Sequence, residues 1–287
     1  MRKIVSLFLL TPVVLMTVKG EVDAGPYDPA AGQPGSLAVH MSDPAFVGWA
    51  SGWLDYQPGA NVSITWQTPN KALGPAVGNS FDVVSLGEGG SIVLTFDRPI
   101  IDGAGWDFAV FENSFSDTFL ELAYVEVSSD GTNYFRFPND SLTPGPVGSY
   151  GAVDPTNITG LAGKYRQGWG TPFDLGVLAG VSPLLDLGNI QFVRIVDIIG
   201  DGTYLDTSGD PIYDPYPTTG SAGFDLDAVG VRYFAPEAHI VPEPSALAIL
   251  LTGIPFIGVK LGRKFRNSKC AGVIQKTESV GDQVTLS

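Results

Sequence analysis

The sequence has one cysteine, two histidines and few basic residues, and each shortage excludes a class of function. Cys270 is the single cysteine in 287 residues, so the chain cannot form a disulfide within itself. Together with the histidines, His40 and His239, it provides too few ligands for a zinc site. A Ser–His–Asp hydrolase would depend on His40, and no Gly-x-Ser-x-Gly motif accompanies that residue. The sequence therefore argues against zinc and serine-hydrolase chemistry.

Basic residues are scarce in the long central part of the chain. Residues 25–240 contain 7 Lys and Arg against 25 Asp and Glu, which gives a net charge of −18. Such a surface repels nucleic acid and other anionic polymers and favours cations. Acidity alone also serves solubility, so it does not by itself indicate a cation site.

The N-terminus has the pattern of a secretory signal peptide. Met1, Arg2 and Lys3 precede an apolar run from Ile4 to Val18, and Val22-x-Ala24 supplies the small residue for cleavage after Ala24. We therefore expect residues 1–24 to direct export and residues 25–240 to form one domain. An earlier cleavage site at Gly20 and an uncleaved N-terminal anchor are the alternatives.

The C-terminal region has three parts in a fixed order. Val241-Pro242-Glu243-Pro244 precedes an uncharged run of 15 residues, Ser245 to Val259, and a basic cluster follows it. As a helix this run covers roughly 22 Å, less than the ~30 Å hydrocarbon core, so it predicts a weak membrane anchor. Basic residues after an apolar run stay on the cytoplasmic side. The cluster consists of Lys260, Arg263, Lys264 and Arg266.

This three-part order resembles the PEP-CTERM sorting signal of Gram-negative bacteria, over residues 241–266. The resemblance implies recognition by an exosortase-type protease, cleavage near Pro242-Glu243-Pro244, and delivery of the upstream chain to the cell surface or an exopolysaccharide matrix. The polar tail 267–287 departs from the family, which usually ends soon after the basic cluster. An ordinary C-terminal membrane anchor is the alternative.

Residues 25–240 show strand patterns and no amphipathic helix. They predict an all-β fold, a two-sheet sandwich of jelly-roll type. Asn139–Gly170 and Ile199–Ser221 lack a strand pattern and are expected to be long loops. The predicted strands are Val62–Gln67, Ser91–Phe96, Gly105–Glu112, Leu120–Ser128, Asn133–Phe137, Phe173–Leu178, Phe192–Ile198 and Asp225–Tyr233.

Ser128–Tyr134 is predicted to be a hairpin turn, because its Asp130-Gly131 pair readily supplies the positive-φ positions that such turns need. With the flanking residues from Val125 to Phe137, it resembles a strand-turn-strand unit of discoidin-like, galactose-binding-type sandwiches. Phe192–Asp197 resembles an inner strand of the same domains. The resemblance implies a sandwich fold and does not identify a sugar.

Carboxylates are the chemical groups that remain. Period-two geometry puts Asp225 and Asp227 on one strand face with Val229 and Val231, and puts Asp197 toward the core. Burial of a charged carboxylate costs free energy unless the group is paired or bound to a metal ion. Calcium is a suitable metal, because it takes 6–8 oxygen ligands. The alternative is that Asp197 pairs with Arg194 or Arg232 and that Asp225 caps a turn. The predicted calcium ligands are Glu112, Asn113, Asp197, Asp201, Asp225 and Asp227.

Aromatic residues in the predicted loops suggest contact with sugar rings. Tyr165 and Trp169, in the predicted loop Asn139–Gly170, are the candidate sugar contacts. The sequence thus predicts an exported, non-catalytic surface module that binds extracellular polysaccharide and holds structural calcium. A carboxylate-based glycosidase and a purely structural matrix protein are the alternatives.

Overall fold

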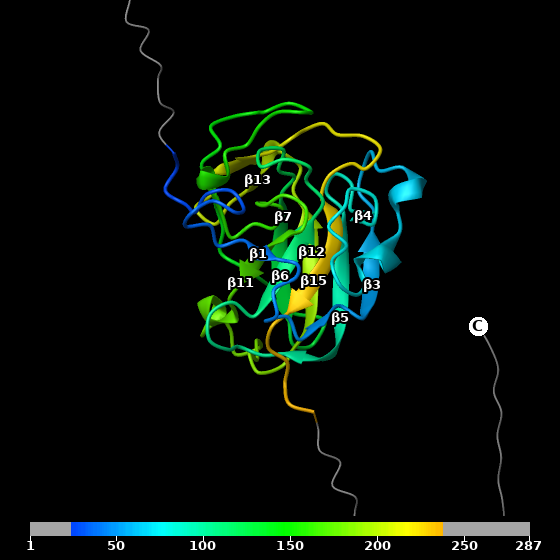
Figure 1. The fold of residues 1–287 in the computed structure, drawn as a ribbon, viewed down its shortest axis with the longest axis vertical. Helices are drawn as coiled ribbons and strands as arrows, with labels where there is room; N and C mark the ends of the chain where they lie inside the picture. The colour runs from blue at the N-terminus through cyan, green and yellow to red at the C-terminus, as the bar shows by residue number, and fades with distance from the viewer. Residues whose placement is uncertain (1–23, 238–287) are drawn as a thin grey trace, which may run out of the picture. The chain divides into compact units, whose positions relative to one another are not determined.

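The computed structural model describes residues 24–237, which fold into antiparallel β-strands with four short 3-10 helices (Figure 1). The first sheet has the order β1-β11-β6-β15-β2, and β4 also pairs with β15. Its strands are β1 (Val39–His40), β11 (Trp169–Phe173), β6 (Phe108–Glu112), β15 (Asp225–Val231), β2 (Gly48–Trp49) and β4 (Val84–Ser85).

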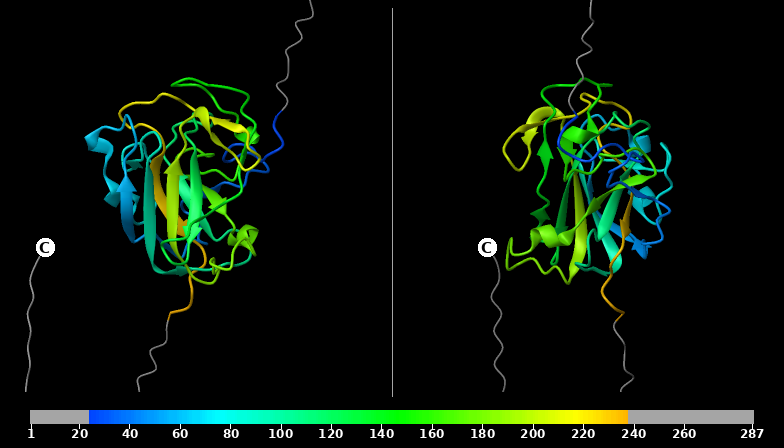
Figure 2. Two further views of the ribbon diagram at one scale, coloured as in Figure 1. Left: turned by 180° about the vertical axis from the view of Figure 1, so that it is seen from behind. Right: turned by 60° about the vertical axis from the view of Figure 1, so that its left-hand side comes forward.

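The second sheet has the order β3-β5-β12-β7-β8. The left panel of Figure 2 shows the molecule from behind, with this sheet toward the viewer. Two further pairs, β9-β10 and β13-β14, stand apart from both sheets. The strands of the second sheet are β3 (Gly52–Gln57), β5 (Ser91–Ile100), β12 (Ile190–Asp197), β7 (Ala123–Ser128) and β8 (Phe135–Arg136). The small pairs are β9 (Asp140–Ser141) with β10 (Ile158–Thr159), and β13 (Asp201–Leu205) with β14 (Pro211–Tyr213).

Both sheets contribute to one main apolar core. Phe108 and Val110 of β6 lie in the same buried cluster as Val125 of β7 and Val193 and Ile195 of β12. The all-β prediction is confirmed, and the arrangement is compatible with a β-sandwich.

Most of the predicted strands are confirmed, and two of them are wrong. Six of them correspond to β5, β6, β7, β8, β12 and β15. Val62–Gln67 is wrong: it contains 3-10 helix η1 (Ile64–Trp66), no residue of which is buried. Phe173–Leu178 is also wrong, because Asp174 accepts a hydrogen bond from the backbone N–H of Gly176 and caps 3-10 helix η4 (Leu175–Leu178).

The predicted hairpin turn is confirmed. Gly131 has φ +74°, and β7 pairs with β8 on either side of the turn. The Asp130 carboxylate accepts hydrogen bonds from the backbone N–H groups of Thr132 and Asn133, both at 2.8 Å. The turn therefore combines a left-handed glycine with a side chain that replaces missing backbone acceptors.

A bulge in β15 overturns the predicted strand face. Leu226 pairs with Glu112 but Ala228 pairs with Phe111, so the register shifts at Asp227. The shift reverses the alternation, and Leu226, Val229 and Val231 all face the main core. Asp225 and Asp227 therefore do not share a face with Val229 and Val231.

The two predicted loops are packed and partly regular. Asn139–Gly170 contains β9, β10 and 3-10 helix η3 (Pro155–Asn157), and Ile199–Ser221 contains β13 and β14. Ile158 and Ile212 from these segments pack with Leu120, Leu122 and Tyr124 in a second buried cluster. The remaining 3-10 helix is η2 (Pro69–Ala72).

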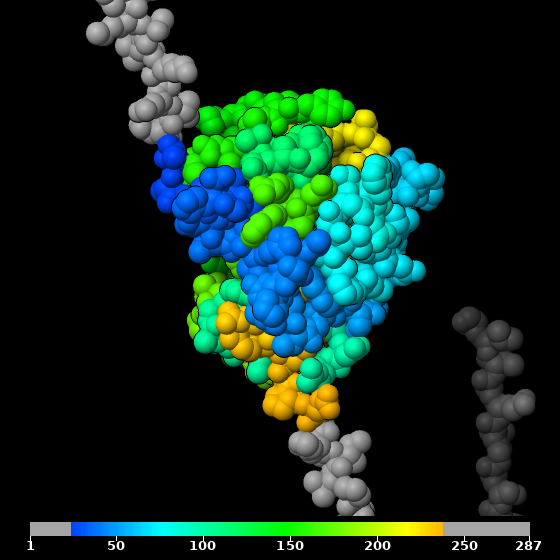
Figure 3. All heavy atoms as spheres, in the orientation of Figure 1, coloured from blue at the N-terminus to red at the C-terminus, as the bar shows by residue number. Residues whose placement is uncertain are grey.

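The outer face of the first sheet is covered by the N-terminal part of the described chain, shown as blue atoms in Figure 3. Phe46 and Trp49 pack on Ala109, Phe111 and Ala228. Covering this face explains how β6 and β15 are buried on both sides.

Residues 1–23 and 238–287 lie outside the described part of the chain. The predicted apolar signal-peptide core, the Pro242-Glu243-Pro244 motif, the anchor and the basic cluster Lys260, Arg263, Lys264 and Arg266 fall there. Among residues 24–237, no helix has the length and apolar character needed to cross a membrane.

Candidate ligand pocket

A hollow of about 270 Å³ opens where the loops after β6, before β7 and before β15 meet; we name it the aromatic pocket. Its wall is largely aromatic and its floor is polar. The lining residues are Trp66, Ser80, Phe81, Asn113, Phe115, Phe119, Glu121, Tyr150, Thr218, Thr219, Ser221 and Asp225.

Exposed aromatic side chains gather at this pocket. Phe81, Phe115 and Tyr150 are 73%, 65% and 87% exposed, and they are the three aromatic members among the exposed large apolar side chains of residues 24–237. All three line the aromatic pocket. The rings of Phe115 and Phe119 stack at 4.9 Å between centroids, and Phe119 stacks on Tyr150 at 6.3 Å. Aromatic side chains that remain exposed to water around one pocket indicate a binding surface.

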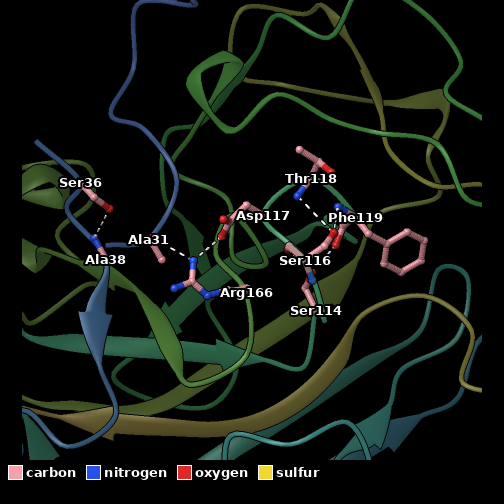
Figure 4. A network of polar contacts seen from close by, with 9 residues as sticks. All are labelled: Ala31, Ser36, Ala38, Ser114, Ser116, Asp117, Thr118, Phe119 and Arg166. Atoms are coloured by element: carbon pink, nitrogen blue, oxygen red, sulfur yellow. Dashed lines mark hydrogen bonds and ion pairs between the residues drawn. The ribbon is translucent and has the colours of Figure 1, made fainter. Parts of the chain in front are cut away.

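The rim loop, residues 114–119, carries two of these rings and is fixed by its own hydroxyl groups (Figure 4). The Ser114 hydroxyl donates to the carbonyl of Ser116 at 2.8 Å and contacts the carbonyl of Phe119. The Ser116 hydroxyl accepts from the backbone N–H of Phe119 at 2.9 Å. The loop is therefore held by side-chain contacts in place of strand pairing.

Arg166 anchors the rim loop to the N-terminal segment (Figure 4). Its guanidinium donates to Asp117 at 2.5 Å and to the carbonyl of Ala31 at 2.9 Å. The ion pair is partly exposed, so it serves position more than stability.

The floor of the aromatic pocket contains carboxylates with unsatisfied oxygens. Asp225, the first residue of β15, is 2% exposed, and Glu121, two residues before β7, is 4% exposed. The Asn113 amide donates to Oδ2 of Asp225 at 3.1 Å. Oδ1 of Asp225 and Oε1 of Glu121 have no hydrogen-bond partner. Glu112 lies nearby and is also buried, and its carboxylate accepts from the backbone N–H of Ser114 at 2.6 Å.

The environment of these carboxylates disfavours their charged forms. Burial raises the pKa of Glu121 well above its usual value, and the charges of Asp225 and Glu112 raise it further. Burial and the charge of Asp225 do the same to the pKa of Glu112. Burial raises the pKa of Asp225 to about 7, although neighbouring Ser85, Asn113 and Ser221 side chains favour its ionised form.

The structure brings together three of the six predicted calcium ligands. Glu112, Asn113 and Asp225 are neighbours through the Asn113–Asp225 hydrogen bond and the pairing of β6 with β15. Glu121 joins them, and the sequence reasoning missed it. The signal that could have found it is the segment Phe115-Ser116-Asp117-Thr118-Phe119, an aromatic-rich turn just before a strand.

The carboxylates of Asp197 and Asp227 instead accept hydrogen bonds from backbone N–H groups. Oδ2 of Asp197 accepts from the N–H of Gly89 at 2.7 Å, and Oδ1 accepts from the N–H of Phe224 at 2.6 Å. Asp197 is buried at the end of β12, on the core side as predicted, and its partners are amides and not an arginine. Asp227 accepts from the N–H groups of Val77 and Gly78 at 3.0 and 2.8 Å.

Asp201 lies apart from this group. It is exposed at the start of β13, and its carboxylate accepts from the backbone N–H and the hydroxyl of Thr203 at 2.9 and 2.6 Å. This is a local turn contact within one strand pair.

The two predicted sugar contacts lie away from the aromatic pocket. Tyr165 is 2% exposed, and its hydroxyl and the Lys164 ammonium both contact the Asp28 carboxylate. Trp169 is half-buried in β11, where it makes an edge contact with His40 at 4.8 Å. The Tyr165 ring therefore presents no open face for stacking.

Another acidic group lies at the start of β6, the end of the strand opposite to Glu112. Carboxylate oxygens of Asp102, Asp107 and Asp174 lie within 4.8 Å of one another, the one such group of three in the described residues. Asp107 is fully buried and accepts from the N–H groups of Gly103 and Leu175, both at 2.7 Å. Its oxygens already have partners, so the group is explained as a loop clamp.

No protein-family model matches this chain, and no curated protein is significantly similar to it.

Proposed function

We propose that this chain is an exported surface or matrix protein whose folded domain binds carbohydrate without catalysis. The observation that carries this proposal is the convergence of Phe81, Phe115 and Tyr150 on one pocket with a polar floor. Flat rings stack on the apolar faces of sugars, while carboxylate, amide and hydroxyl groups bind sugar hydroxyls. The pocket volume of about 270 Å³ suits one sugar unit of a longer chain.

Export and sorting belong to the same proposal. The signal-peptide pattern, the motif at residues 242–244 and the basic cluster support delivery to the cell surface or an exopolysaccharide matrix by an exosortase-type protease. A jelly-roll sandwich is the finer fold that we propose for the two sheets. Structural calcium, expected from the sequence, is the rival occupant of the pocket floor.

A glycan array with the purified chain tests carbohydrate binding. Tyr150→Ala and Phe115→Ala are expected to weaken binding several-fold each, since one stacked ring contributes about 1 kcal/mol. Leu184→Ala is the matched control, because Leu184 is 57% exposed and does not line this pocket. Equal loss in all three variants, or an array without binding, would contradict the proposal.

A carboxylate-based glycosidase is the second candidate, favoured by the raised pKa values of Glu121 and Asp225 in the same pocket. Glycoside hydrolysis needs one protonated and one ionised carboxyl group. Here burial raises the pKa of both groups, and no basic side chain lines the pocket to keep one ionised. Binding without release of reducing sugar supports the first function, and release supports the second.

A further inference from the structure

The pocket floor carries acidic groups that no basic residue of the described chain neutralises. Five of the seven Lys and Arg side chains in residues 24–237 form ion pairs with Asp82, Glu126, Asp28 or Asp117. The other two, Arg98 and Arg232, lie over aromatic rings away from the aromatic pocket. Glu121 and Asp225 therefore have no cationic partner on this part of the chain.

Buried carboxylates without a partner are neutralised by a proton, a metal ion or a cationic ligand. The aromatic wall of the pocket distinguishes between a metal ion and a cationic ligand. A cation is attracted to the face of an aromatic ring, most strongly when it is poorly hydrated. Calcium instead takes 6–8 oxygen ligands and gains nothing from rings. In residues 24–237, carboxylate oxygens of three residues lie within 4.8 Å of one another only at Asp102, Asp107 and Asp174, none of which lines the aromatic pocket.

We propose that the aromatic pocket binds a protonated amine, and that the carbohydrate it recognises is an amino sugar with a free amino group. This inference rests on the carbohydrate binding proposed above. The rings hold the sugar face, while the ammonium group donates to Oε1 of Glu121 and Oδ1 of Asp225. Both residues line the pocket while these two oxygens are buried and unpaired, and rotation about the soft terminal torsion of each carboxylate turns an oxygen toward the ligand.

The charge of the whole domain agrees with this ligand. The net charge of −18 over residues 25–240 attracts a cationic polymer and raises its rate of association. An N-acetylated sugar lacks the charge and therefore leaves both carboxylates unpaired.

The test compares short glucosamine oligomers with N-acetylglucosamine oligomers of equal length, by calorimetry with the purified full-length chain. We expect about tenfold tighter binding of the glucosamine oligomers, weakened by added salt. Glu121→Gln and Asp225→Asn are each expected to lower that affinity about tenfold and to leave the N-acetylated oligomers unaffected. Asp97→Asn is the control, because it removes one negative charge at an exposed position of β5 outside the aromatic pocket.

The outcomes separate the two levels of the proposal. Equal affinity for both oligomers overturns the amine inference and supports carbohydrate binding, whereas binding of neither, with an empty glycan array, overturns both. Calcium that binds one to one and is lost in Asp225→Asn assigns the floor to a metal and also overturns the inference. If a carboxylate variant does not fold, salt-independent binding of glucosamine oligomers to the unmodified chain is the overturning result.

Discussion

Asp225 links the stability of the domain to its candidate ligand pocket. It is buried at the start of β15, and its unpaired oxygen lies at the pocket floor. A residue chosen for stability alone would have both oxygens bound, as in Asp197. Asp225 is therefore less stabilising than a fully bonded carboxylate, and its unpaired oxygen is the group that the proposed ligand would bind.

The raised pKa of Asp225 predicts a pH dependence of stability. In the unfolded chain this carboxyl loses its proton near pH 4, whereas in the folded chain it keeps the proton until about pH 7. Between these values the folded state binds more protons, so its stability falls as pH rises from about 4 to about 7. Ser85, Asn113 and Ser221 oppose the shift, and Glu112 and Glu121 titrate in the same direction.

Asp225→Asn is expected to flatten this decline, and urea unfolding at several pH values measures it. The contribution of the single group is at most about 4 kcal/mol. Asp97→Asn is the control, and an unchanged slope in Asp225→Asn would show that Asp225 is not the group responsible.

At the scale of elements, carboxylates fasten loops to the central strands. Asp227 lies at the bulge of β15 and binds the backbone of Val77 and Gly78, and Asp197 joins the end of β12 to Gly89 and Phe224. Both act where regular pairing stops, because backbone N–H groups there need other acceptors.

Asp227→Ala is expected to destabilise the domain by about 2–4 kcal/mol, since it leaves two backbone N–H groups without an acceptor. The midpoint of urea unfolding measures this loss. Asp201→Ala removes an exposed carboxylate that contacts only Thr203, so it should cost less than about 1 kcal/mol. Equal losses in the two variants would contradict a clamping role for Asp227.

Ser114→Ala tests the rim loop as a separate unit. The variant removes the hydroxyl that contacts Ser116 and Phe119, so Phe115 and Phe119 lose their fixed position. We expect several-fold weaker carbohydrate binding with a loss of about 1 kcal/mol in stability. Ser36→Ala, whose hydroxyl accepts from the N–H of Ala38 outside the loop, is the matched control. Unchanged binding in Ser114→Ala would show that the loop needs no such support.

At the scale of the whole chain, the folded domain and the terminal segments bear on different parts of the proposed function. Residues 24–237 contain the core and the aromatic pocket, whereas the proposed export and sorting signals lie in residues outside them. The single cysteine, Cys270, lies outside residues 24–237, so the folded part contains no disulfide and its stability depends on its buried core.

The proposed processing at residues 242–244 predicts the mass of the mature protein. Cleavage near residues 242–244 removes the apolar run, the basic cluster and the tail 267–287. Mass spectrometry of the surface fraction is therefore expected to find a chain that ends near Glu243. Replacing Lys260, Arg263, Lys264 and Arg266 by Gln should reduce surface delivery, since the stop at the membrane is lost. An intact tail in the surface fraction would contradict sorting by cleavage.

Local pattern was sufficient for the all-β class, the Asp130-Gly131 hairpin and most of the long strands. Alternation reports burial on a single strand, and turn chemistry acts within a few residues. The same reasoning placed Asp197 on the core side of β12.

Only the tertiary structure decided the aromatic pocket. Its rings and carboxylates come from segments between Trp66 and Asp225, and no spacing in the chain indicates that they meet. The bulge at Asp227 reversed the strand face, a shift that depends on pairing with β6. Strand identity is a local property, whereas register and convergence depend on partners distant in the chain.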